Sequence, residues 1–190
     1  GIGVTDDLYQ EGDSWAVFGQ ASFSISETLT LTTGVRFNNE NKDGGGDLYQ
    51  FQFGPPGVVN PFFKAVIDED DTTGMVSLQN DFSESVMGYI TYQRGYKAGG
   101  INLAREAAGN MGQSGEPTFD SEGAKNLELG IKSEIFDGKL RLNTAFFKTE
   151  YDDVQSQVLV GQSFLVRNGK GAEINGFEVE GLLALTDNLA

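Results

Sequence analysis

The sequence predicts an all-β fold, specifically an antiparallel up-and-down segment of a transmembrane β-barrel that supplies about seven strands of a larger barrel. Three observations predict it. Apolar and polar residues alternate with a period of two over long segments. Short turns and long loops alternate along the chain. The chain also has 26 glycines and 11% aromatic residues but only 4 prolines, as is typical of a β-protein with many turns.

The alternation is clearest in the first two predicted strands. Their apolar faces consist of Trp15, Val17, Ala21, Phe23 and Ile25 in one strand, and of Leu29, Leu31, Val35 and Phe37 in the other. Further strands are expected near residues 75–82, 86–96, 126–135, 140–146 and 172–183, with a bulge at Asn175-Gly176 in the last. The facing of residues 86–96 stays open.

The connections predict which ends of the strands lie together. Short turns occur at Ser26-Glu27-Thr28, Ser83-Glu84-Ser85, Asp137-Gly138 and Thr186-Asp187-Asn188, roughly every 50 residues. Long polar or glycine-rich loops are expected between them, at residues 41–71 and 97–122. Outer-membrane barrels have this asymmetry, with short periplasmic turns and long extracellular loops.

Two other architectures fit parts of the pattern. A kelch-type propeller repeats near 50 residues, but its blades need four short strands where this chain offers two long ones. A soluble β-rich adhesion or binding domain would require the apolar face of Leu29, Leu31, Val35 and Phe37 to meet a protein core instead of lipid.

The composition excludes several kinds of chemistry. The chain has no Cys and no His, and its 13 basic and 28 acidic residues give a net charge of −15. Ordinary zinc and thiol sites, serine–histidine triads and nucleic-acid binding are therefore disfavoured, and we expect neither an enzyme nor a cofactor or metal site. The acidic run Asp68-Glu69-Asp70-Asp71 lacks the spacing of a calcium loop and is interpreted as a solvated loop base.

Three longer segments resemble one known family. They are YITYQRGYKAGGIN at residues 89–102, KNLELGIKSEIFDGKLRLN at 125–143 continuing through AFFKTEYDDVQ at 145–155, and RNGKGAEINGFEVE at 167–180. Their order and spacing are similar to those of TonB-dependent outer-membrane receptors. The resemblance covers most of the chain outside the predicted loops.

The resemblance implies a function that periodicity does not show. Such a receptor carries an N-terminal plug inside a barrel of about 22 strands, so residues 1–190 would form a partial barrel domain, with the plug, its TonB box and the C-terminal strands absent from this sequence. It would import a scarce nutrient, most often a ferric siderophore, across the Gram-negative outer membrane, with energy delivered by TonB through the plug region. A passive porin-type channel is the alternative within membranes, and the cargo stays unidentified.

The expected partners follow from this interpretation. They are TonB, the ferric siderophore or similar cargo, and outer-membrane lipid. About seven strands cannot close such a barrel, so the isolated segment is expected to pair its open edges in an oligomer, to curl, or to need detergent.

Candidate binding residues lie on the polar faces and in the first long loop. Arg36, Arg94 and Arg141 are candidate lumen cations for anionic cargo or for plug carboxylates, although each could simply pair with a neighbouring strand. Tyr49, Phe51 and Phe53 would either grip cargo at the mouth or pack the loop against itself.

Two further sets of side chains are assigned to structural roles. Interfacial girdle positions are expected for Trp15, Phe37, Phe82, Phe136, Phe147 and Tyr151. Charge ladders facing the plug are expected from Glu128, Lys132, Glu134, Glu178 and Glu180.

Overall fold

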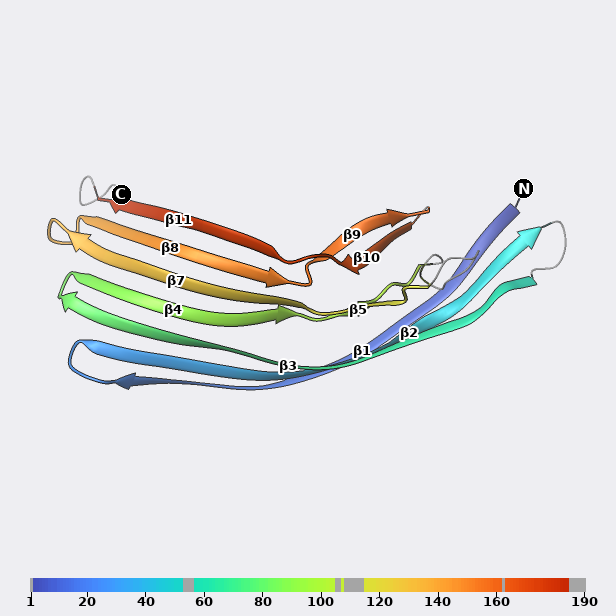
Figure 1. The fold of residues 1–190 in the computed structure, drawn as a ribbon, viewed down its shortest axis with the longest axis horizontal. Coiled ribbons are helices and arrows are strands. Elements are labelled where there is room, and N and C mark those ends of the chain that lie inside the picture. The colour runs from blue at the N-terminus through green and yellow to red at the C-terminus, as the bar shows by residue number, and fades with distance from the viewer. Residues whose placement is uncertain (1, 53–56, 105–106, 108–114, 162, 185–190) are drawn as a thin grey trace.

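Seven antiparallel strands form one curved sheet in the computed structural model (Figure 1), which describes residues 2–52, 57–104, 107, 115–161 and 163–184. Their order in the sheet is the order in the chain: β1 (Ile2–Ser24), β2 (Leu29–Gln52), β3 (Gly57–Ser83), β4 (Val86–Lys97), β7 (Glu122–Ile135), β8 (Leu140–Asp152) and β11 (Ala172–Leu183). The predicted all-β, up-and-down segment of about seven strands is confirmed. No helix among the described residues is long and apolar enough to cross a membrane.

Two small ladders stand apart from the main sheet. β5 (Gly100–Ile101) pairs with β6 (Thr118–Phe119) in the connection between β4 and β7. β9 (Gln155–Val160) pairs with β10 (Ser163–Asn168) in the connection between β8 and β11. Both lie at the end of the sheet opposite its short turns (Figure 1).

The cross-strand register separates the sheet into two faces. One, the apolar face, carries exposed hydrophobic side chains from every strand: Trp15, Val17, Val35, Phe37, Val76, Leu78, Ile90, Tyr92, Leu127, Leu129, Ile131, Phe146, Phe177 and Val179. The other, the polar face, includes Gln20, Arg36, Ser77, Thr91, Gln93, Asn126, Glu128, Thr149, Glu178 and Glu180. A soluble β-domain buries such an apolar face, whereas a barrel in lipid exposes it.

The register also settles the facing of β4, which the sequence left open. Ile90 pairs with Leu78 and Leu129, so it belongs to the apolar face. Thr91 pairs with Ser77 and Glu128, so it belongs to the polar face.

The turn between β7 and β8 has the predicted primed geometry. Asp137 and Gly138 both have positive φ, at 54° and 81°, and the Lys139 amide donates to the Phe136 carbonyl at 3.2 Å. Positive φ at both central residues matches the right-handed twist of the flanking strands, so the chain reverses within a few residues.

The expected loop at residues 41–71 was wrong. β2 and β3 continue as paired strands through this segment, from Leu29↔Asn80 to Gln50↔Gly57, and β1 pairs with β2 as far as Ile2↔Gln52. We call the outer parts of these strands, residues 2–13, 40–52 and 57–70, the β1–β3 extension. Gly45 permits close approach there, because a Cβ on it would lie 2.1 Å from the Phe63 carbonyl oxygen.

Two smaller expectations were also wrong. The pairing of β11 with β8 is continuous from Ala172↔Tyr151 to Leu183↔Leu140, so no bulge occurs at Asn175-Gly176. Phe147 and Tyr151 line a hollow on the polar face rather than a girdle. The Trp15–Phe37 pair does lie at the outer edge of the apolar face, with ring centroids 5.5 Å apart.

Few apolar side chains are buried in the part of the chain that the structure describes. Ala65 and Ile67 of β3 form a cluster with Ile101 of β5, and Leu103 packs against it. The β4–β7 connection is therefore folded against the polar-face side of the β1–β3 extension.

Candidate functional site

A hollow of about 670 Å³ opens on the polar face near the middle of the sheet. Every strand of the sheet contributes to its lining, which includes Phe18, Arg36, Gln93, Glu128, Phe147 and Glu178. The lining combines aromatic rings, amides and charged groups, the mixture expected of a surface that contacts polar ligands or a polar protein segment.

Arg36 is a cation of this hollow that forms no ion pair among the described residues. Its guanidinium stacks on the Phe18 ring, 5.6 Å from the centroid, and its Nε donates to Asn38 Oδ1 at 2.5 Å. Among the described residues it forms no ion pair, and its side chain is exposed. A planar guanidinium held over an aromatic face keeps its remaining N–H groups directed outward for an anionic partner.

Arg94 contributes to the same hollow but its charge is already engaged. Its two terminal nitrogens each donate to a different Asp71 carboxylate oxygen, both at 2.9 Å, and one also donates to the Thr72 carbonyl. This fork lies where β3 and β4 cease to pair, after Gly74↔Arg94. Arg94 thus joins two diverging strands, as the structural alternative expects, and its role toward cargo stays a prediction.

Arg141 lies apart from the other two arginines. It pairs with Glu134 at 2.9 Å beside the β7–β8 turn, and both side chains are at least half exposed. It lines a second hollow, of about 790 Å³, at the short-turn end of the sheet. Arg141 therefore does not join Arg36 and Arg94 in one site.

The three aromatic candidates fall in the β1–β3 extension or outside the described residues. Tyr49 and Phe51 belong to β2, with their backbones paired to Thr5 and Gly3, so they are not loop residues as expected. Phe53 lies outside the described residues. Their role in gripping cargo stays a prediction.

The acidic run occupies β3 and its members are separated by the alternation of the strand. Asp71 binds Arg94, Asp70 accepts from Asn39 Nδ2 at 3.0 Å, and Glu69 accepts from the Gly99 amide at 3.0 Å. Within the part of the chain that is described, no three acidic side chains gather around a common point that could hold a metal ion. The run is therefore part of a strand, not the loop base that we expected.

The expected charge ladder is only partly formed by ion pairs. Glu128 accepts a hydrogen bond from Tyr89 Oη at 2.6 Å, and Lys132 Nζ lies 5.4 Å from the centre of the Tyr89 ring. Glu180 accepts from Asn143 Nδ2 at 3.2 Å.

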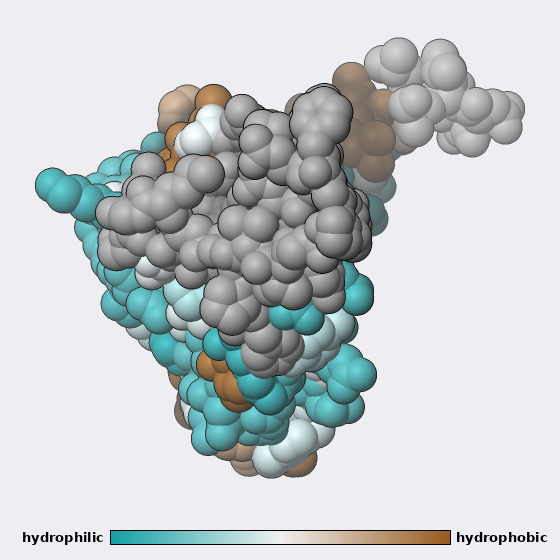
Figure 2. All heavy atoms as spheres, turned by 90° about the vertical axis from the view of Figure 1, so that its right-hand side faces the viewer, coloured by the Kyte–Doolittle hydropathy of each residue, from teal (hydrophilic) through white to brown (hydrophobic). Residues whose placement is uncertain are grey.

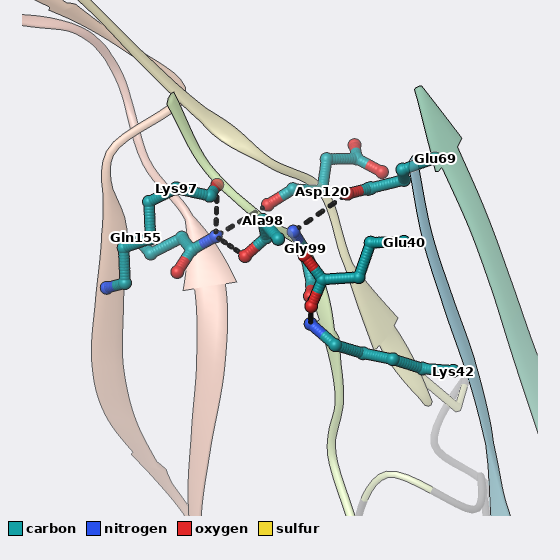
Figure 3. A network of polar contacts seen from close by, with 8 residues as sticks. All are labelled: Glu40, Lys42, Glu69, Lys97, Ala98, Gly99, Asp120 and Gln155. Atoms are coloured by element: carbon teal, nitrogen blue, oxygen red, sulfur yellow. Dashed lines mark hydrogen bonds and ion pairs between the residues drawn. The ribbon is translucent and has the colours of Figure 1, made fainter. Parts of the chain in front are cut away.

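A polar network joins the connections at the outer end of the polar face (Figure 3). Gln155 Nε2 donates toward the carbonyl oxygens of Ala98 and Asp120, at 2.9 and 3.0 Å. The Gly99 peptide is held on both sides, since its N–H donates to Glu69 and its C=O accepts from Lys42 Nζ at 2.6 Å. Lys42 also pairs with Glu40 at 2.8 Å.

The outer end of the molecule is mainly hydrophilic. Figure 2 views the molecule from that end and shows hydrophilic residues over most of its coloured surface, with hydrophobic residues in smaller patches.

Comparison of the sequence with models of known families shows the family of this chain. The model of the family described as TonB dependent receptor-like, β-barrel matches residues 2–189. The chain belongs to this family. It is accordingly a segment of a Gram-negative outer-membrane receptor barrel.

Named relatives of the receptor segment include two curated proteins of Pseudomonas putida. The ferric-pyoverdine BN7/BN8 receptor is 26% identical over 89% of this chain and 19% of its own length. The ferric-pyoverdine 358 receptor is 28% identical over 86% of this chain and 18% of its own. The chain thus spans about a fifth of the length of these relatives.

A solved structure supports the same architecture. The ferric yersiniabactin uptake receptor FyuA from Yersinia pestis matches with a TM-score of 0.75 at 20% identity, over 97% of this chain and 26% of that one. At this identity the likeness establishes the fold.

Several residues of the receptor's polar face escaped the sequence analysis. Phe18 sits at an even position between Ala16 and Gln20, so the alternation alone placed it on the polar face, but nothing marked it as a platform for Arg36. Nothing in the sequence indicated that Lys42, Gly99 and Gln155 form a network, and Glu69 was noted only as part of the acidic run. These residues meet only after strands and connections far apart in sequence are folded together.

Proposed function

We propose that the full receptor actively imports a ferric siderophore, or a similar anionic metal chelate, across the outer membrane with energy supplied through TonB. In this proposal residues 1–190 form part of the barrel wall. The plug that contacts TonB and the remaining strands would come from other parts of the full receptor.

The observation that carries the proposal is the state of Arg36. It is an exposed lumen cation stacked on Phe18, it has no ion-pair partner among the described residues, and it lies in a hollow lined by strands from the whole segment. An unpaired guanidinium in such a setting binds carboxylates and other anionic oxygens in forked geometry. The names of the curated relatives, which are ferric-pyoverdine receptors, support a ferric chelate as the cargo.

The proposed transport follows from differential affinity. Cargo binds at the outer mouth and in the lumen, and a TonB-driven change in the plug lowers that affinity so that cargo is released inward. Arg36 would act as one of the anion-binding groups along this route.

Uptake of radioactive iron measures the proposed activity. The full-length gene is expressed in a strain without other siderophore receptors, and uptake of ferric chelates is followed with and without a proton uncoupler. We expect uptake of at least one ferric siderophore, and we expect the uncoupler to abolish it. Uptake that persists with the uncoupler would indicate a passive porin, and no uptake of any ferric chelate would contradict the proposal.

The role of Arg36 is measured by direct binding. Arg36→Met is expected to weaken cargo binding by about tenfold, the effect of losing one hydrogen-bonded charge in a partly screened site. Arg141→Met is the matched control, because Arg141 is already paired with Glu134 at the short-turn end. Equal affinity of the two variants and the parent would remove Arg36 from the binding route without affecting the uptake result.

A further inference from the structure

Part of the connection between β4 and β7 is bound on two sides by different kinds of hydrogen bond. We call residues 97–103 and 117–120 the strap. On one side the strap contacts the β9–β10 hairpin and the residues that lead into it. On the other it rests on the β1–β3 extension through Glu69, Lys42 and the Ala65–Ile67 cluster.

Neutral amide side chains join the strap to the β9–β10 hairpin. Asn102 is 6% exposed, and its side chain forms two hydrogen bonds with the backbone of Val166. Asn102 Nδ2 donates to the Val166 carbonyl at 2.9 Å, and Asn102 Oδ1 accepts from the Val166 N–H at 2.8 Å. Asn168 bonds the backbone of Asp120 in the same way: its Nδ2 donates to the Asp120 carbonyl at 2.8 Å, and its Oδ1 accepts from the Asp120 N–H at 2.7 Å. Each pair copies the bonding of a β-bridge with a side chain in place of one backbone.

Gln155 adds a third tie on this side. Its Nε2 reaches the carbonyls of Ala98 and Asp120, so it spans both halves of the strap (Figure 3). Because all of these bonds join neutral amides to backbone groups, neither salt nor an ionic ligand competes strongly for them.

A single residue, Gly99, carries the polar contacts that we trace on the opposite side. The Gly99 N–H donates to Glu69 at 3.0 Å, and the Gly99 carbonyl accepts from Lys42 at 2.6 Å. Both bonds are charge-assisted, so each depends on one ionised side chain. The fit is tight, since a Cβ on Gly99 would lie 2.5 Å from Glu69 Oε1 and 2.6 Å from the Phe119 carbonyl.

A small apolar contact accompanies this joint. Ile101 packs on Ala65 and Ile67, and these three residues are buried to 8% exposure or less. The contact is small, because it consists of these three side chains and of Leu103, which packs against them.

We propose that the strap and the β9–β10 hairpin form one rigid unit that separates from the β1–β3 extension at Gly99. The Lys42–Gly99–Glu69 joint is the releasable side, and the Asn102, Gln155 and Asn168 ties hold the unit together. Release uncovers the lumen side of Ala65 and Ile67 at the outer mouth. This inference concerns the motion of the mouth and is independent of which cargo the receptor takes.

Distances between spin labels in the full receptor, reconstituted in lipid, test the proposal. Residues 1–190 contain no Cys, so labels are placed at exposed Val66, Thr118 and Leu159 after any cysteine elsewhere is replaced. The Val66–Thr118 pair spans the releasable joint, and the Thr118–Leu159 pair lies within the proposed unit. We expect a second, longer Val66–Thr118 distance while the Thr118–Leu159 distribution stays single and narrow.

Breaking the joint is expected to shift the first distance alone. In the double variant Lys42→Met, Glu69→Ala, the ratio of long to short Val66–Thr118 populations should rise by about tenfold or more, since each charge-assisted bond holds the closed state. The matched control Lys148→Met, Glu150→Ala removes an equally charged pair from β8 and should change neither distance.

Three outcomes would overturn the proposal. These are an unchanged Val66–Thr118 distribution in the double variant, a broadened Thr118–Leu159 distribution in the same variant, and an equal shift in the control. If the double variant does not fold, the single variant Lys42→Met removes one of the two charge-assisted bonds of the joint, and the same two distances are measured with a smaller rise expected in the long Val66–Thr118 population.

Discussion

At the scale of single residues, glycines opposite aromatic side chains shape the lumen wall. Tyr89 pairs with Gly130 across β4 and β7, and Phe147 pairs with Gly176 across β8 and β11. A Cβ on Gly130 would lie 2.4 Å from the Tyr89 ring, and one on Gly176 would lie 2.6 Å from the Phe147 ring. Each ring therefore lies over a glycine and fills the space that a side chain would otherwise occupy.

Gly130→Ala should destabilise the barrel by about 1–3 kcal/mol, because the new methyl group forces the Tyr89 ring away and breaks its hydrogen bond to Glu128. Gly95→Ala is the matched control, since nothing lies within 4 Å of its added Cβ. We expect the control to be neutral or stabilising by less than about 1 kcal/mol, because alanine has less freedom in the unfolded chain. Urea unfolding of the full receptor in lipid vesicles measures both, and equal costs would contradict the ring-over-glycine account.

At the scale of elements, the β1–β3 extension shows where sequence periodicity fails. Within the membrane the two faces of a strand meet different solvents, so alternation predicted β2 correctly from Leu29 to Asn38. Beyond Asn38 both faces meet water or polar loops, and residues such as Asn39 and Asn41 occupy the face that carried Phe37 and Val35. The period-two signal therefore disappears while the backbone pairing continues.

The strap was unpredictable for a different reason. Its position depends on Asn102, Gln155 and Asn168, which bind backbone groups at least 14 residues away, up to 64 for Asn102. Side-chain amides of this kind have no periodicity and no local motif. The sequence therefore predicted a loop between β4 and β7 but not what the loop contacts.

The β1–β3 extension also carries a titratable contact outside the apolar face. Asp43 accepts from Tyr9 Oη at 2.9 Å and pairs with Lys64 at 2.5 Å. The hydrogen bonds from Lys64 and then Tyr9 hold the pKa of Asp43 below its ordinary value, and Asp43 in turn raises the pKa of Lys64.

This contact should make the extension sensitive to acid. A carboxyl group with a lowered folded-state pKa stabilises the fold above its ordinary pKa, and this stabilisation is lost as the pH falls through the lowered value. We expect amide hydrogen exchange near Asp43, corrected for the intrinsic rate, to accelerate below about pH 4 in the parent. In Lys64→Met the exchange should already be faster at neutral pH and the acceleration in acid should be smaller, because most of the lowering of the Asp43 pKa is removed. Identical profiles would show that the pair does not hold the strands together.

At the scale of the whole molecule, the two faces of the sheet differ in their chemistry. Hydrophobic residues such as Leu129 and Phe146 are more than half exposed on one face, and the hollow with Arg36 lies on the other. β1 and β11 each have one neighbour within the sheet that is described, so both edges offer unpaired backbone groups. In the full barrel other strands would satisfy them, and the association of an isolated segment through these edges stays a prediction.

An arginine on each face should distinguish lipid from lumen. Leu129 lies amid the apolar face, between Ile90 and Phe146 on neighbouring strands, so Leu129→Arg places a charge in hydrocarbon and should cost about 2–4 kcal/mol near the bilayer midplane. Gln93→Arg puts the same charge on the lumen side, beside Met75 and Asn126, and should cost less than about 1 kcal/mol.

Reversible urea unfolding of the full receptor in vesicles gives both values, and the difference between them is the decisive quantity. A difference of about 2 kcal/mol or more requires that the two faces meet different media. Equal costs would mean that both faces meet water. A large cost for Leu129→Arg that persists when the segment folds in detergent-free buffer would mean that a protein core covers this face, as in a soluble β-domain. The orientation argued from cross-strand register holds only if the cost depends on lipid.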